Sequence, residues 1–351
     1  LGSKKWVGLA DVRYRFYPGG LFPKITASVT AKSFHLDHLP STDLYARFFR
    51  IAPQIKAELP SKTATFSHTL QLTTLFLGRE TPIDGTDGLK KWRNSTIYEL
   101  RYEGEQRMLP NPFQYRFALE AQPAGNAQYR QQYLRTTASW QQHVYFTPKR
   151  KITARFFAGY FFQNDFRKLD IQAPFNNLTL LPQGFNDYKY EQLFLARSGA
   201  EGLLGRQVSQ TDGGFKGAFG PAQAGTLGNS NHLVVSINLK TDLPFRLPFG
   251  IPLKPYFDLG YADDASKSGL NRPFDEQLLW NGGLMLEFLK GGLEVYFPLF
   301  SAAALKAEYC KQAGGTGQTG LFCGGNYLKV ISWSTKINSV EPLDIVQRQI
   351  R

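Results

Sequence analysis

The sequence predicts an all-β protein, a transmembrane antiparallel β-barrel of about 14–16 strands. Apolar and polar residues alternate with a period of two almost throughout, the alternating segments run for about 10 to 14 residues, and long and short connections alternate. A mean hydropathy of −0.31 and 20% charged residues exclude a helical membrane protein, because a spanning helix needs about 20 consecutive apolar residues. They do not exclude a barrel, in which only every second residue of a strand faces lipid.

The first segment shows the pattern. Val12, Tyr14 and Phe16 share one face, and Asp11, Arg13 and Arg15 share the other. The other segments expected as strands are 24–32, 49–58, 65–76, 98–103, 113–120, 135–146, 152–162, 188–197, 208–219, 232–240, 253–261, 277–288, 293–300 and 327–337. No segment predicts a helix. The 14% aromatic content fits an outward apolar face with girdles at the strand ends.

Two other β architectures compete with the barrel. A soluble sandwich or propeller uses shorter strands around a packed core, and a solenoid shows an internal repeat, which is absent at any fixed period. The polar faces carry Thr, Ser, Gln, Arg and Glu, which suit a wet lumen and favour the barrel.

Connection lengths support the same fold. The short connections are 18–21, 59–62, 108–112, 148–151, 200–205, 243–252 and 290–292. The connections in the positions of the long ones are 35–43, 79–93, 122–126, 164–187, 220–231, 263–276 and 302–326, of which 122–126 is short for its class. If the last strand runs towards the periplasm, the number of strands that the sequence contains is odd, whereas bacterial barrels have an even number of strands. We therefore expect about sixteen strands, with the first either upstream of Leu1 or supplied by a cleaved segment. The barrel is expected over 1–339 and a periplasmic tail over 340–351. Because residues 1–9 lack the features of a signal peptide, we expect a processed product or a fragment.

Charge and cysteine content narrow the partners and the compartment. The net charge is +13, but the basic residues stand singly at alternate strand positions and in turns, which argues against nucleic acid as a partner. Cys310 and Cys323 flank a loop without metal-ligand spacing, which favours a disulfide and an oxidising compartment over unpaired thiols.

The candidate functional residues are charged side chains expected to point into the lumen. One hypothesis is a charged pore, and the other is a network of ion pairs that stabilises and plugs the barrel. Arginine on the lipid face costs a few kcal/mol at the midplane, so the lumenal placement is the firmer inference. The residues are Arg13, Arg15, Arg50, Arg101, Arg116, Arg135, Arg155, Glu99, Glu103 and Glu120, with Lys56, Glu58 and Glu287 in the same pattern.

No sequence motif indicates catalysis, a cofactor or a metal. The sequence lacks His-Glu-x-x-His, Gly-x-Ser-x-Gly and the phosphate-loop motif. The glycine-rich run 213–220 is interpreted as a strand or loop, and His35, Asp37 and His38 as a solvated external loop. The remaining acidic candidates, Asp258, Asp263 and Asp264, are expected to be rim charges rather than a weak cation site.

Several segments resemble the C-terminal region of bacterial gluzincin metallopeptidases of the aminopeptidase N type. These segments are 190–197, 201–207, 212–216, 229–232, 253–260 and 293–299. In that family a zinc peptidase precedes a segment that looks like an outer-membrane barrel, so the resemblance implies the barrel part alone. The zinc motif is missing, and no catalytic residue carries over. The outer-membrane insertase family is a weaker match, because its periplasmic repeats and its Val-Arg-Gly-Phe/Tyr signature are not found.

Together these observations predict an integral protein of the outer membrane of a Gram-negative bacterium. The expected partners are the lipid bilayer, lipopolysaccharide and other outer-membrane or periplasmic proteins. The expected role is a membrane anchor or scaffold subunit; the alternatives are a channel for small solutes and a soluble extracellular β protein.

Overall fold

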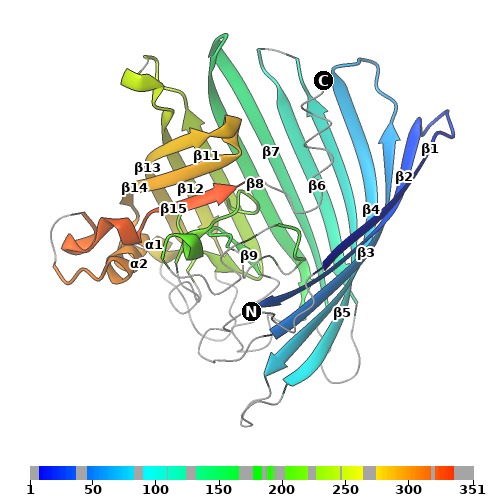
Figure 1. Ribbon diagram of the computed structural model, residues 1–351, viewed down its shortest axis with the longest axis horizontal. Coiled ribbons are helices and arrows are strands. Elements are labelled where there is room, and N and C mark those ends of the chain that lie inside the picture. The colour runs from blue at the N-terminus through cyan, green and yellow to red at the C-terminus, as the bar shows by residue number, and fades with distance from the viewer. Residues whose placement is uncertain are drawn as a thin grey trace.

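The computed structural model describes residues 8–36, 46–82, 90–108, 110–123, 132–165, 177–183, 187, 189–192, 194, 202–219, 227–245, 247–263, 274–317 and 321–335 (Figure 1). The strands are β1 (Gly8–Phe16), β2 (Lys24–Leu36), β3 (Ala46–Leu59), β4 (Phe66–Pro82), β5 (Lys90–Gln106), β6 (Phe113–Gln122), β7 (Tyr133–Thr147), β8 (Arg150–Asn164), β9 (Leu178–Thr179), β10 (Asn229–Ser230), β11 (Leu233–Thr241), β12 (Leu253–Ala262), β13 (Leu278–Phe288), β14 (Leu293–Ser301) and β15 (Ser332–Thr335). The predicted tail 340–351, together with Asp37, His38, Asp264 and the side chain of His35, lies outside the described residues.

A single antiparallel sheet of 13 strands forms the wall of the molecule, in the order β1 to β8 and then β11 to β15. The sheet curls around a central space, with β1 and β15 as its edges within the described part of the chain (Figure 1). The prediction of an all-β antiparallel barrel is confirmed. Within the described residues, no helix is long and apolar enough to cross a membrane.

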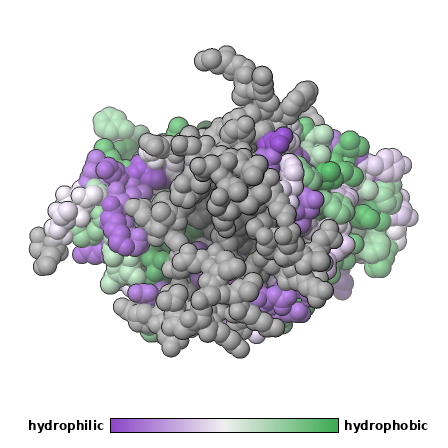
Figure 2. All heavy atoms as spheres, turned by 90° about the horizontal axis from the view of Figure 1, so that it is seen from below, coloured by the Kyte–Doolittle hydropathy of each residue, from purple (hydrophilic) through white to green (hydrophobic). Residues whose placement is uncertain are grey.

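The two faces of the wall differ as the alternation predicts. On β5, Tyr98 and Leu100 are 48% and 43% exposed on the outside, whereas Glu99 is 2% exposed on the inside. The outer apolar surface extends around the wall, and Figure 2 shows such residues on both outer flanks. Its members include Val12, Val29, Ile55, Leu72, Phe76, Phe117, Leu119, Val144, Ile152, Phe156, Phe162, Val235 and Leu239.

Two of the predicted strands are wrong. The described residues of 188–197 form a turn with Tyr190 at φ 54°, and 208–219 is irregular chain. The described residues of both segments accept hydrogen bonds from wall side chains: Tyr190 from Lys32, and Gly213 from Ser236 and Asn238. The predicted turn 200–205 overlaps a short 3₁₀ helix (Leu204–Arg206) within the same connection. Because the two wrongly predicted strands are neighbours, the alternation of long and short connections holds for the remaining strands.

We name the described residues between β8 and β11, 177–183, 187, 189–192, 194, 202–219 and 227–232, the lumenal insert. It contains the small sheet of β9 and β10. Its Leu180 and Phe215, both fully buried, pack with Leu279 of the inner wall and Leu305 in one apolar cluster. The lumen is therefore partly filled with apolar side chains, contrary to the uniformly wet lumen expected from the polar strand faces.

A helix in the last long connection was not expected from the sequence. The helix α2 (Ala303–Ala313) ends at Gly314, which adopts the left-handed conformation with φ 72°. Ala, Leu, Lys and Glu in its first turns favour a helix locally. A short helix α1 (Phe274–Gln277) precedes β13. Within the described part of the predicted strand 327–337, Tyr327–Lys329 form a 3₁₀ helix, and the strand β15 begins at Ser332.

The predicted disulfide between Cys310 and Cys323 is present, with their Cα atoms 5.4 Å apart. It joins α2 to the 3₁₀ helix Leu321–Gly324. Tyr309 and Phe322 beside it are buried, with ring centroids 4.9 Å apart. The disulfide thus holds α2 over the apolar cluster of the lumen.

Replacing both cysteines with serine should lower stability, since a cross-link that closes a loop of this length contributes roughly 3 kcal/mol on the loop-entropy model. Thermal unfolding of C310S/C323S in detergent, followed by circular dichroism, should show a lower Tm than the parent chain. Reduction of the parent should reproduce that decrease, and an unchanged Tm would contradict the stabilising role.

Candidate functional site: the lumenal insert

One end of the lumenal insert is held by Tyr190. Its ring packs on Phe48, with centroids 5.0 Å apart, in an apolar cluster formed with Leu75, Leu77 and Ile97 of the inner wall. The carboxylate of Asp187 accepts hydrogen bonds from the backbone amides of Glu191 and Gln192, at 3.2 and 2.9 Å. This turn directs the Tyr190 ring into the wall.

Charged residues flank Tyr190 on both sides. The Lys189 ammonium pairs with both Glu99 and Glu120. On the other side, Arg101 pairs with Glu191 at 3.2 Å. Lys32 of β2 donates to the Tyr190 carbonyl at 3.2 Å. This end of the insert therefore joins strands β2, β5 and β6.

The surroundings shift the pKa values of Lys189 and Glu191 in the directions that keep both side chains charged. Burial alone would lower the pKa of Lys189, but attraction to Glu120 and then Glu99 outweighs it and raises the pKa. Burial alone would raise the pKa of Glu191, but attraction to Arg101 and then Lys189 lowers it well below its usual range.

The glycine-rich run holds the other end of the insert. A Cβ on Gly213 would lie 2.3 Å from the Leu180 Cα, so only glycine permits this close approach of two backbones. The Gly213 carbonyl accepts hydrogen bonds from Ser236 and Asn238 of β11, both at 2.9 Å. Gly214 adopts the left-handed conformation with φ 64°. This irregular backbone places Lys216 against the wall.

Lys216 and Asp258 form a buried ion pair between the insert and β12. Asp258 is 0% exposed and also accepts from the Lys216 backbone amide at 3.1 Å and from Asn238 at 3.0 Å. The Lys216 carbonyl accepts from the Ser332 hydroxyl of β15. Asp258 is thus a lumenal partner of the insert, and the prediction that it is a rim charge was wrong.

A third contact joins the insert to the last strands. Gln210 donates to Glu294 at 2.6 Å, and Glu294 pairs with Lys240 at 2.7 Å. The Val208 amide donates to the Trp333 carbonyl at 2.8 Å, next to a parallel bridge between Gln207 and Trp333. The insert therefore covers part of the free edge of β15.

The sequence-predicted charges occupy the inner side of the wall, on the face opposite the outer apolar residues. Arg50, Glu99, Glu120 and Arg135 are buried, and Arg101 is half-buried. The others are placed as follows: Arg13 pairs with Asp11 at 2.8 Å, Arg116 pairs with Glu103 at 2.6 Å, Arg155 donates to Asn238 at 2.9 Å, and Arg15 is exposed on β1. Of the related residues, Glu58 pairs with Lys24 at 2.6 Å, Glu287 pairs with Lys240 at 2.9 Å, and Lys56 is half-buried on β3.

Sequence reasoning missed the partners that the insert supplies. Lys189, Tyr190 and Lys216 lie in segments predicted as wall strands, where alternation assigned them no special role. Spacing alone could not pair them with Glu99 or Asp258, which are distant in the sequence. Among the predicted residues, the structure brings together Glu99, Arg101, Glu120 and Arg135 around one end of the insert.

The charged and polar side chains of the insert attach it to the inner face of the wall through ion pairs and hydrogen bonds. Among the described residues, no group of three or more His, Cys, Asp or Glu side chains could hold a metal ion. Asp263 hydrogen-bonds to His232 and, at 3.4 Å, to Tyr261. The run 213–219 lies within the lumen rather than at the start of a helix. The charged groups of this site neutralise one another.

No protein-family profile matches the chain, and no curated protein matches it. Among solved structures, CdiB from Acinetobacter baumannii is similar at 10% identity and a TM-score of 0.42, over 84% of this chain and 47% of that one. CdiB from Escherichia coli is similar at 12% identity and a TM-score of 0.42, over 80% and 47%. BamA from Haemophilus ducreyi lacking POTRA domains 1–3 is similar at 11% identity and a TM-score of 0.46, over 84% and 59%. The chain spans about half the length of these structures. The peptidase origin implied by the sequence resemblance finds no support in these comparisons.

Lys216→Met should destabilise the insert strongly, because it leaves the Asp258 carboxylate buried without its cation, which typically costs about 3–5 kcal/mol. We expect a lower Tm in detergent and faster trypsin cleavage after Arg206, the site in 202–219 that the substitution leaves intact. Lys306→Met, which removes an exposed lysine of α2, is the matched control and should change neither measurement. The double variant K216M/D258L should regain most of the lost stability, and equal behaviour of K216M and K306M would contradict the assignment.

The contact around Tyr190 should be stable at neutral pH and weaken in acid. Because the pKa of Glu191 is lowered, its contribution is complete above its ordinary pKa of about 4.3 and is lost as the pH falls towards the lowered value. Because the pKa of Lys189 is raised, its contribution is complete below about 10.4 and is lost only above that. Hydrogen exchange of residues 187–194, corrected for the intrinsic rate, should be constant from about pH 6 to 9 and faster near pH 3. Glu191→Gln should reduce this pH dependence. Equal pH dependence in the parent and in the Glu191→Gln variant would contradict the role of Glu191.

Proposed function

We propose that the chain is an integral barrel of the outer membrane of a Gram-negative bacterium and serves there as a membrane anchor or scaffold subunit. Its lumen is closed by its own insert. The observation that carries the proposal is the reversed polarity of the wall: apolar side chains are exposed outside, and charged side chains are buried inside.

The outer surface supports a lipid environment. Soluble monomers rarely expose contiguous apolar patches of more than a few hundred Å². Here the exposed outer residues extend over strands from β1 to β14, with Val12 at 72%, Ile55 at 54% and Phe162 at 61% exposure. Strands β4 and β5 have 17 residues each, and β7 and β8 have 15 each, beyond the 9–11 or so that a spanning strand requires.

The lumenal insert favours a scaffold over an open channel. The buried contacts of Lys189, Lys216 and Gln210 attach it to strands from both halves of the sheet. Apolar side chains of the insert, the wall and α2 pack together in the lumen. Solute conduction through this packed part would require breaking several charged contacts.

We also propose that the scaffold holds another outer-membrane or periplasmic protein. A connection to a metallopeptidase follows only from the sequence resemblance, and the same preparation that tests the anchor tests this connection. Purification in mild detergent, followed by mass spectrometry of the retained proteins, should identify an outer-membrane or periplasmic component.

In functional tests the chain should associate with membranes without conducting. We expect it to float with phosphatidylcholine vesicles after carbonate extraction and to show no unitary conductance in planar bilayers. Recovery in the aqueous phase without detergent would overturn the membrane proposal. Stable unitary currents that persist after removal of contaminants would instead favour the small-solute channel.

A further inference from the structure

The short-turn end of the wall exposes large apolar side chains on two neighbouring turns. Phe249, in the β11–β12 turn, is 103% exposed, and Leu289, in the β13–β14 turn, is 80% exposed. The turns are adjacent, since the Glu287 amide donates to the Pro252 carbonyl at 3.1 Å. Exposing such side chains to water costs free energy, and covering them with an apolar surface would lower it.

Both residues also occupy an unfavourable backbone conformation. Phe249 has φ 58° and Leu289 has φ 53°, in the left-handed region that favours glycine over residues with a Cβ. Glycine would relieve this backbone cost, but it would remove the apolar side chain. Phe249 and Leu289 thus each combine a left-handed backbone with an exposed apolar side chain at the same end of the wall. This combination indicates that this end of the wall contacts an apolar phase.

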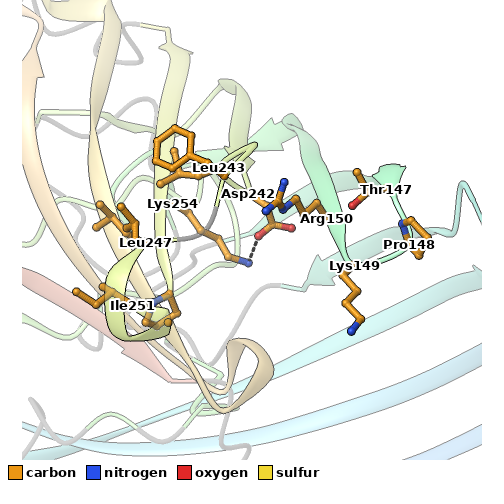
Figure 3. Close-up of a pocket in the computed structure, with 13 residues that line it drawn as sticks. Thr147, Pro148, Lys149, Arg150, Asp242, Leu243, Leu247, Ile251 and Lys254 are labelled. Carbon is orange, nitrogen blue, oxygen red and sulfur yellow. Dashed lines mark ion pairs between the residues drawn. The ribbon is translucent and has the colours of Figure 1, made fainter.

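A cavity of 630 Å³ lies beside the β11–β12 turn, against the β7–β8 hairpin (Figure 3). Its apolar lining includes Leu243, Phe245 and Ile251, and its basic lining includes Lys149 and Arg150. Phe245 and Ile251 are 59% and 48% exposed. The cavity thus combines apolar and cationic groups at one rim of the wall.

The positive charge at this rim is not neutralised by the neighbouring acid. Asp242 pairs with Lys254 at 2.8 Å and accepts from the Lys151 amide at 2.7 Å. Arg150 donates to the uncharged carbonyl of Pro244. Lys149 is exposed and extends away from the Asp242–Lys254 pair (Figure 3).

We propose that this cavity binds the headgroup of an anionic phospholipid, with Lys149 and Arg150 on the phosphate and Phe245 and Ile251 against the upper acyl chain. The proposal rests on the membrane location proposed above. Cations beside an apolar surface at the membrane boundary attract anionic headgroups.

Continuity with the outer belt favours lipid over a protein partner. Arg150 shares the outward face of β8 with Ile152 and Phe156, which are 43% and 47% exposed. Arg150, which lines the cavity, therefore lies at the end of the outer apolar surface. The exposed cations of the cavity complement a phosphate at that boundary.

Native mass spectrometry of the full chain in detergent tests the site. The probes are phosphatidylglycerol and phosphatidylcholine with identical acyl chains. The parent chain should bind phosphatidylglycerol about tenfold more tightly, because each nearby cation favours anionic lipid. K149Q/R150Q should reduce this preference to about twofold or less, and Phe245→Ser should weaken binding of both lipids.

The control variant K62Q/R107Q removes two cations from other short turns and should keep the preference. Far-ultraviolet circular dichroism checks that all variants retain their strand content. Excess inorganic phosphate should leave lipid binding unchanged. If phosphate abolished lipid binding, the site would be one for free anions, and the lipid assignment would be overturned. The lipid assignment would also be overturned if the parent bound both lipids equally, or if K62Q/R107Q reduced the preference as much as K149Q/R150Q does. A dimer of the chain that is seen for the parent and lost only in K149Q/R150Q would indicate a protein interface instead of a lipid site. A parent that floats with vesicles but shows no preference refutes this site alone, whereas failure to float refutes the membrane proposal.

Discussion

The buried pairing of opposite charges across the lumen is the interaction on which the rest of the structure depends. Removing an ammonium and a carboxylate from water is costly unless each meets a partner with good geometry. Lys189 meets Glu99 and Glu120, and Lys216 meets Asp258. The wall can bury Glu99 and Asp258 because the insert supplies a cation to each of them.

The outer and inner faces impose different requirements on the same strands. Outside, an apolar side chain is needed at every second position, and size matters little. Inside, each polar group needs a specific partner, because an unpaired buried charge destabilises the fold. This asymmetry explains why Glu120 is held by Arg135 at 3.2 Å and by Lys189, while its outward neighbour Leu119 remains exposed.

Alternation predicted the wall well because a strand repeats every two residues whatever its neighbours are. It placed Glu99, Arg101 and Glu120 correctly on the inner face. It failed for 208–219 and for the described residues of 188–197, which pack inside the wall as irregular chain. The same local pattern serves an extended strand and a segment that packs between two surfaces, and only long-range contacts distinguish them. Helix α2 was missed because a short helix carries little periodic signal.

The position of the insert also constrains the order in which the molecule can assemble. Neighbouring strands pair through local hairpins, which form early because little chain must be ordered to close them. Lys32 and Tyr190, by contrast, are separated by 158 residues, and Lys216 reaches β12 from the other side of the same connection. A finished wall would obstruct entry of a segment that touches both halves. We therefore expect the insert to pack against the wall while the sheet is still curling, so that the curvature of the sheet and the packing of its interior develop together.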